Sequence, residues 1–142
     1  TQTVCLDSRK YDTVAYNIDD NNYFKLRDIA KILDGTIKTF DIQYDSATNS
    51  IDMLSFYDYK SAGGELTPGD GVERTALSSS AFLTLDGVPI KATCYNIEGN
   101  NYFKLRDITD ALDCRVEWDN KTQMIWVIPG RTAYDDPDEI VG

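Results

Sequence analysis

The sequence predicts an α+β fold made of two duplicated lobes, each a small antiparallel sheet with one amphipathic helix packed on one face. The first observation is a repeat: residues 16–34 return 79 positions later as residues 95–113, with 14 of 19 positions identical. Such self-similarity marks an internal duplication, so the chain contains two copies of one folding unit. The other two are strand-like alternation on both sides of each repeat and an apolar stripe at helical spacing inside it.

Each copy opens with the pattern of a β-hairpin. Residues 4–11 align with residues 83–90, where Asp86-Gly87 between β-prone flanks is a strong signal for a tight turn. In the first copy, the second strand is expected to continue through residues 16–18. A cluster of Asp and Asn must then turn the chain again, and a further short strand leads into the helix.

The helix of the first copy is predicted from its spacing. Its apolar residues fall at i, i+3, i+4 and i+7, which places them on one face: Leu26, Ile29, Ala30 and Leu33. The second copy repeats the stripe with Leu105, Ile108, Ala111 and Leu112. Gly35 is expected to end the first helix.

A closing hairpin is predicted after each helix. The copies align here at an offset of 74, with residues 40–45 over residues 114–119, so the first copy holds five extra residues at 35–39. Alternation along these strands places Tyr44 and Trp118 on the inward face. We therefore expect both aromatic rings in the core.

Composition divides the chain into four parts. Residues 1–60 form the first repeat and residues 81–130 the second. Between them, residues 61–80 are rich in Gly, Ser and Pro and are predicted to form a linker. Residues 131–142 are acidic and are expected to form a loose tail.

Composition also excludes several classes of function. A net charge of -10 over 142 residues, without clustered Lys or Arg, disfavours nucleic acid and anionic membranes as partners. No apolar run is long enough for membrane insertion. The absence of histidine excludes imidazole catalysis and His-ligated metals, and no calcium-binding loop motif is present. We therefore expect a protein that is not an enzyme and that uses no metal or cofactor.

The three cysteines leave two redox states open. Cys5, Cys94 and Cys114 are compatible with one disulfide and a leftover thiol, or with three reduced thiols. Cys114 aligns with Phe40 at an inward position, where a thiol can serve as a small hydrophobe.

The candidate binding residues are aromatic. Trp126 aligns with Asp52, and its two neighbours align with aliphatic residues that should face inward. Trp126 should then face outward, where it contacts a partner or packs against the other lobe. Tyr57 and Tyr59 are expected to alternate on one strand face before the linker, and the same two interpretations apply to them.

The repeated sequence motifs resemble those of a known family. Tyr-Asn-Ile followed by Asn-Asn-Tyr-Phe-Lys-Leu-Arg-Asp-Ile occurs from Tyr16 and again from Tyr95, and Gly-Gly-Glu-Leu follows at residues 63–66. This pattern resembles the stalk-domain family, often labelled copper amine oxidase N-terminal-like, of secreted and surface proteins of Gram-positive bacteria. The resemblance extends from Val4 to Ile128.

The resemblance implies a small α+β module that lies outside the cell, secreted or at the cell surface, and has no chemistry of its own. The copper in the family's name belongs to a separate catalytic domain. An oxidising compartment would also allow a Cys94–Cys114 disulfide within the second lobe.

We therefore expect a non-catalytic extracellular stalk module that spaces or attaches neighbouring domains and presents a protein- or glycan-binding surface. Trp126, Tyr57 and Tyr59 are its candidate contact residues. The alternative is an accessory domain that binds cell-wall polysaccharide for a secreted hydrolase. The expected partners are a protein or a cell-wall glycan, and not nucleic acid.

Overall fold

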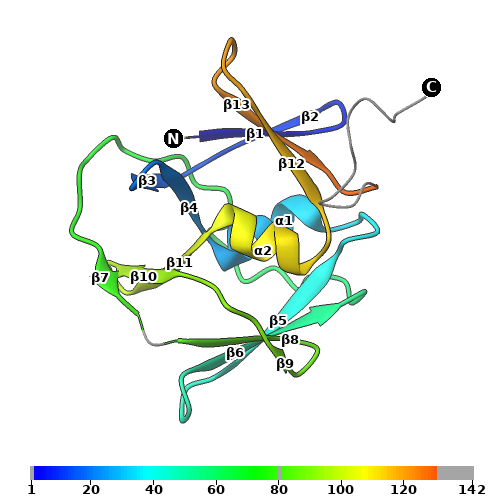
Figure 1. Cartoon of the computed structure of the whole chain (residues 1–142), viewed down its shortest axis with the longest axis vertical. Helices are drawn as coiled ribbons and strands as arrows, with labels where there is room; N and C mark the ends of the chain where they lie inside the picture. Colours follow the sequence, from blue (N-terminus) through cyan, green and yellow to red (C-terminus); the bar gives the residue numbers. More distant parts are fainter. Residues whose placement is uncertain (1, 80, 131–142) are drawn as a thin grey trace.

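The computed structural model describes residues 2–79 and 81–130. Among these residues 45% lie in strands and 12% in helices, and the strands form three sheets (Figure 1). The prediction of an α+β fold is therefore wrong, because strands far outnumber helices and the fold is mostly β. The predicted acidic tail, residues 131–142, lies outside the described residues.

The two copies have the same order of elements. The first contributes β1 (Gln2–Leu6), β2 (Arg9–Thr13), β3 (Tyr16–Ile18), β4 (Asn21–Lys25), α1 (Leu26–Leu33), β5 (Phe40–Asp45) and β6 (Ser50–Ser55). The second contributes β8 (Phe82–Leu85), β9 (Val88–Pro89), β10 (Cys94–Ile97), β11 (Asn100–Lys104), α2 (Leu105–Ala111), β12 (Arg115–Asp119) and β13 (Met124–Ile128). Between them lies the short β7 (Leu77–Ser78).

Each outer sheet combines strands from both copies. One sheet has the order β12-β13-β1-β2 and the other β5-β6-β8-β9. Val4 pairs with Ile125 in the first, and the equivalent residues Leu83 and Ile51 pair in the second, both in parallel strands. The opening hairpin of each copy thus joins the closing hairpin of the other. The prediction of two lobes, each with its own antiparallel sheet, is wrong for this reason.

The central sheet joins the copies about an approximate twofold axis. Its order is β3-β4-β11-β10-β7, and Phe24 of β4 lies opposite Phe103 of β11, its own equivalent in the other copy. The second strand does not continue through residues 16–18 as expected. Instead β2 ends at Thr13 and the chain crosses from an outer sheet to the central one.

The core lies around the two helices, which Figure 1 shows at the centre, with one outer sheet above and one below. The predicted stripe of α1 is confirmed, since all four of its residues are buried. In α2 the stripe is buried at Leu105 and Ile108, and Leu112 is buried just beyond the helix, but Ala111 is only partly buried. Residues of both copies share one apolar cluster, which includes Phe24, Phe40 and Phe103.

The segment predicted as a linker, residues 61–80, is held against the rest of the fold where the structure describes it. The Val14 N–H donates to the Thr67 carbonyl over 2.9 Å, and β7 pairs with β10. The Leu66 N–H donates to the Asp28 carboxylate of α1, also over 2.9 Å. The segment therefore packs against both copies.

Candidate functional site: a groove beside Trp118

Trp126 lies on β13 and faces outward as expected. Its neighbours Ile125 and Val127 are buried, whereas 36% of Trp126 is exposed. Whether this indole contacts a partner stays a prediction.

Tyr57 and Tyr59 are not on a strand, because β6 ends at Ser55. Alternation therefore does not place them on one face. Tyr57 is exposed, but Tyr59 is buried. Its hydroxyl accepts a hydrogen bond from Arg27 Nη1 over 3.3 Å, and burial raises its pKa. Tyr59 is thus part of the packing, and only Tyr57 is accessible to a partner.

The three cysteines are free thiols, and all three are buried. The Cys94–Cys114 disulfide that the resemblance allowed is not formed. Cys94 begins β10 of the central sheet, and Cys114 precedes β12 of an outer sheet. Burial raises the pKa of the Cys114 thiol to about 11 and also raises the pKa of Cys94.

The raised pKa of Cys114 predicts a loss of stability in alkaline solution. The thiol ionises near 9.0 when the chain is unfolded and near 11 when it is folded. Between these values the unfolded chain loses a proton that the folded protein keeps, so the free energy of unfolding falls as the pH rises. We expect Cys114→Ala to lose less stability over this window, by on the order of 2 kcal/mol. Urea denaturation at pH 9 and 11 measures this, and equal losses in both proteins would contradict it.

The prediction that Tyr44 and Trp118 are core residues is wrong. Tyr44 is 54% and Trp118 41% exposed. Alternation did identify the correct face, because Trp118 lies opposite the buried Ile125. The next inward position, Val116, is itself only partly buried. Burial therefore decreases along β12 away from the helix, and Trp118 reaches an open groove.

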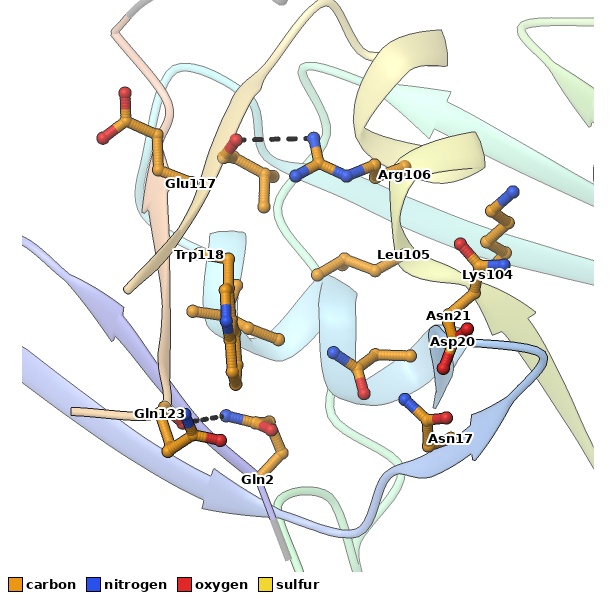
Figure 2. A pocket seen from close by; sticks show the side chains of 13 residues that line it. Gln2, Asn17, Asp20, Asn21, Lys104, Leu105, Arg106, Glu117, Trp118 and Gln123 are labelled. Carbon is orange, nitrogen blue, oxygen red and sulfur yellow. Dashed lines mark hydrogen bonds between the residues drawn. The ribbon is translucent and has the colours of Figure 1, made fainter. Parts of the chain in front are cut away.

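We call this space the Trp118 groove, a cavity of about 430 Å³. It lies between β12, the start of α2 and the turn from β3 to β4, so both copies contribute to it. Figure 2 shows Trp118 on one side and the polar side chains on the other: Asn17, Asp20, Asn21 and Lys104. Arg106 lies at one end, and Gln2 and Gln123 lie at the other.

Hydrogen bonds hold the walls of the Trp118 groove in place. Trp118 Nε1 donates to Asn120 Oδ1 over 2.7 Å, which fixes the orientation of the indole ring. Gln2 Nε2 donates to the Gln123 carbonyl over 2.8 Å and joins β1 to the turn before β13. These bonds arrange the aromatic wall before any ligand enters.

The opposite wall carries polar groups that the fold does not use. Within the described residues no hydrogen bond or ion pair engages the side chains of Asn17, Asp20, Asn22 or Lys104. An amide both donates and accepts hydrogen bonds, an ammonium donates and a carboxylate accepts. The wall can therefore bind a ligand rich in hydroxyl or amide groups.

The groove is lined by charges of both signs, Asp20, Lys104 and Arg106. Glu117 lies opposite Trp126 on the outer face of β12, and its carboxylate is paired with Arg115 over 2.8 Å. In the part of the chain that the structure describes, no three Cys, Asp or Glu side chains group as metal ligands. The lining thus fits a polar ligand that both donates and accepts hydrogen bonds.

Trp118 also borders a second, shallower recess on the outside of the sheet. This recess of about 720 Å³ includes Trp126, and Glu117 lines both spaces. Two indoles therefore lie along one continuous surface around the edge strand β12.

Sequence reasoning missed this site because it assigned Trp118 to the core. A usable signal was present in the repeat itself, since the turn carries two Asn residues in both copies. Only the exchange of hairpins brings the turn of one copy close to the Trp of the other.

No family model matches the chain, and comparisons with curated proteins and with solved structures find no match. Neither helix in the described residues is long and apolar enough to span a lipid bilayer.

Proposed function

We propose that this chain is a non-catalytic extracellular stalk module whose Trp118 groove binds a neutral glycan. The observation that supports this most is the exposed indole of Trp118, which faces unpaired amide side chains across a cavity of about 430 Å³. Ligand sites commonly combine an aromatic surface with a few polar groups that fix orientation.

A sugar ring matches the two walls of the groove. One face of a pyranose presents C–H groups, which pack on the electron-rich face of an indole. Its hydroxyl groups both donate and accept, as do the amides of Asn17 and Asn22 on the opposite wall. The carboxylate of Asp20 beside these amides favours a sugar that has no carboxylate of its own.

One further observation supports a role without catalysis, and another supports a location outside the cell. The chain has no histidine for acid–base catalysis. Its repeated sequence motifs resemble those of the stalk-domain family of secreted and surface proteins. We propose the extracellular location from this resemblance.

The alternative proposal is an accessory domain that binds cell-wall polysaccharide for a secreted hydrolase. It is favoured by the continuous surface from Trp118 to Trp126, because a polymer can occupy both recesses while a short ligand fills one.

We expect Trp118→Ala to weaken binding of an N-acetylglucosamine tetrasaccharide at least about tenfold, because the variant loses the stacking surface. Its free energy of unfolding should change by only about 1 kcal/mol, since the ring is partly exposed. Isothermal titration and urea denaturation measure the two effects.

Tyr57→Ala is the control, because it removes an exposed aromatic ring away from the groove. Trp126→Ala separates the two proposals: weaker binding of long peptidoglycan strands but not of the tetrasaccharide supports the polysaccharide-binding domain. Equal tetrasaccharide binding by Trp118→Ala and wild type, or none by wild type, would refute the groove as a neutral-glycan site.

A further inference from the structure

The approximate twofold axis creates a second groove, which we call the Tyr44 groove. It has a volume of about 230 Å³. Tyr44 takes the place of Trp118, and Lys25 and Arg27 take the places of Lys104 and Arg106. The turn at residues 99–101 of the second copy takes the place of the turn at residues 20–22.

The two grooves differ in charge. Gly99 occupies the position of Asp20, so the Tyr44 groove lacks the carboxylate of the Trp118 groove. The lining of the Tyr44 groove therefore contains Lys25 and Arg27 and no carboxylate. A cationic cavity on a chain with a net charge of -10 is a local feature that attracts an anion.

The aromatic ring of the Tyr44 groove is exposed, and Lys25 lies between this groove and a neighbouring recess lined by Asp70 and Glu98. Tyr44 is 54% exposed, and its hydroxyl donates to Asn49 Oδ1 over 3.2 Å. Among the described residues no ion pair or hydrogen bond engages the ammonium of Lys25. Arg27 donates to the neutral hydroxyl of Tyr59, so its positive charge is not neutralised by that contact.

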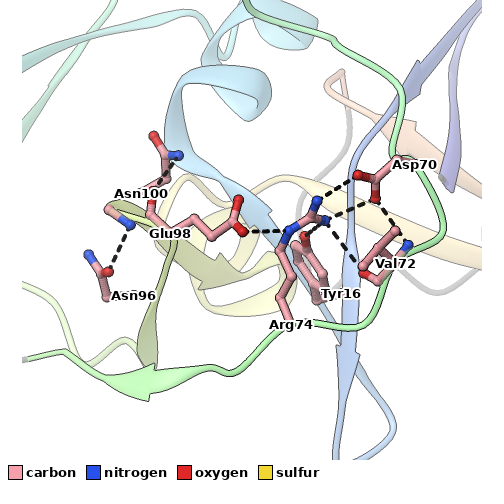
Figure 3. Close-up of polar contacts among 8 residues, drawn as sticks. Tyr16, Asp70, Val72, Arg74, Asn96, Glu98 and Asn100 are labelled. Atoms are coloured by element: carbon pink, nitrogen blue, oxygen red, sulfur yellow. Dashed lines mark hydrogen bonds and ion pairs between the residues drawn. The ribbon is translucent and has the colours of Figure 1, made fainter.

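An ion-pair network holds the turn that forms the far wall (Figure 3). Arg74 Nε lies 2.9 Å from Glu98 Oε1, and the same guanidinium contacts Asp70 and the hydroxyl of Tyr16. The Gly99 N–H donates to Asn96 Oδ1 over 3.1 Å. The Glu98 carboxylate, which lies next to the Tyr44 groove, is therefore already paired with Arg74.

We propose that the Tyr44 groove binds a glycan that carries a carboxylate, with the acid beside Lys25 and Arg27 and the sugar ring on Tyr44. This inference rests on the proposed function of the Trp118 groove, because it extends the same kind of site to the second copy. The duplication thus produced two sites of one architecture and different charge preference, one for neutral and one for acidic sugars.

The test uses tetragalacturonate and its methyl ester, which differ only in charge. Wild type should bind the acid at least about tenfold more tightly than the ester, because only the acid pairs with the two cations. Tyr44→Ala and Lys25→Gln should each weaken binding of the acid at least about tenfold. Both variants should bind the N-acetylglucosamine tetrasaccharide as wild type does. Lys10→Gln, which removes an exposed lysine elsewhere, should bind the acid normally.

The outcomes separate this inference from the proposed function. Binding of the acid that depends on Trp118 and not on Tyr44 would overturn the inference, and so would equal binding of acid and ester. Binding of the neutral tetrasaccharide alone would overturn the inference and keep the proposed function. Tyr44-dependent binding of the acid without binding of the neutral tetrasaccharide would support the inference and refute the neutral site.

Discussion

Phe24→Ala is expected to lower the free energy of unfolding by about 3–5 kcal/mol, the cost of removing a large buried ring and leaving a cavity. Phe24 is 1% exposed and lies opposite Phe103, which is fully buried. The two rings occupy the junction where the copies pair in the central sheet. Urea denaturation followed by tryptophan fluorescence measures the loss.

Phe82→Ala is the matched control, because Phe82 is 51% exposed. Its expected effect is within about 1 kcal/mol. Because strands of both copies share every sheet and one core, wild type should unfold in one cooperative transition. Equal losses in the two variants, or two separate transitions, would show that the copies do not share a core.

Asp28→Ala is expected to cost about 2–4 kcal/mol, because it leaves a buried hydroxyl and a half-buried N–H without an acceptor. Asp28 is 1% exposed. Its carboxylate accepts a 2.8 Å hydrogen bond from Thr13 Oγ1 and a 2.9 Å bond from the Leu66 N–H. This side chain thus joins α1 to β2 and to the segment between the copies. Thermal and urea denaturation measure the effect.

The duplication supplies the control. Asp107 is the equivalent residue of α2, but it is only partly buried and accepts one hydrogen bond, from the Thr93 N–H over 2.9 Å. Asp107→Ala should therefore cost about 1 kcal/mol or less. If both variants lost the same free energy of unfolding, the two hydrogen bonds of Asp28 would not explain a larger effect at this position.

Much of the local structure follows from sequence patterns. The helical spacing from Leu26 to Leu33 predicted α1, and the Asp86-Gly87 turn predicted the hairpin of β8 and β9. These features depend on interactions between residues close in the chain, which periodicity and turn chemistry report. The inward face of β13 was also predicted correctly, since strand alternation is a local property.

The pairing of the hairpins could not be predicted from these patterns. Val4 pairs with Ile125, a residue far away in the chain, although its own copy offers the equivalent Ile51. Either choice buries the same apolar face, so the hydrophobic pattern does not distinguish them. The predicted lobes were wrong because the sequence specifies which side of a strand is apolar and not which strand covers it.

The candidate site could likewise be predicted from the sequence only in part. The sequence alone determined that the chain is duplicated, that it lacks histidine, and that positions 44 and 118 carry aromatic rings on the inward face of a strand. Only the tertiary structure decided that these rings lie beyond the buried core and that each faces the Asn-rich turn of the other copy. The physical reason is that exposure and contact between distant residues depend on how sheets pack, whereas local patterns determine only the direction in which a side chain points.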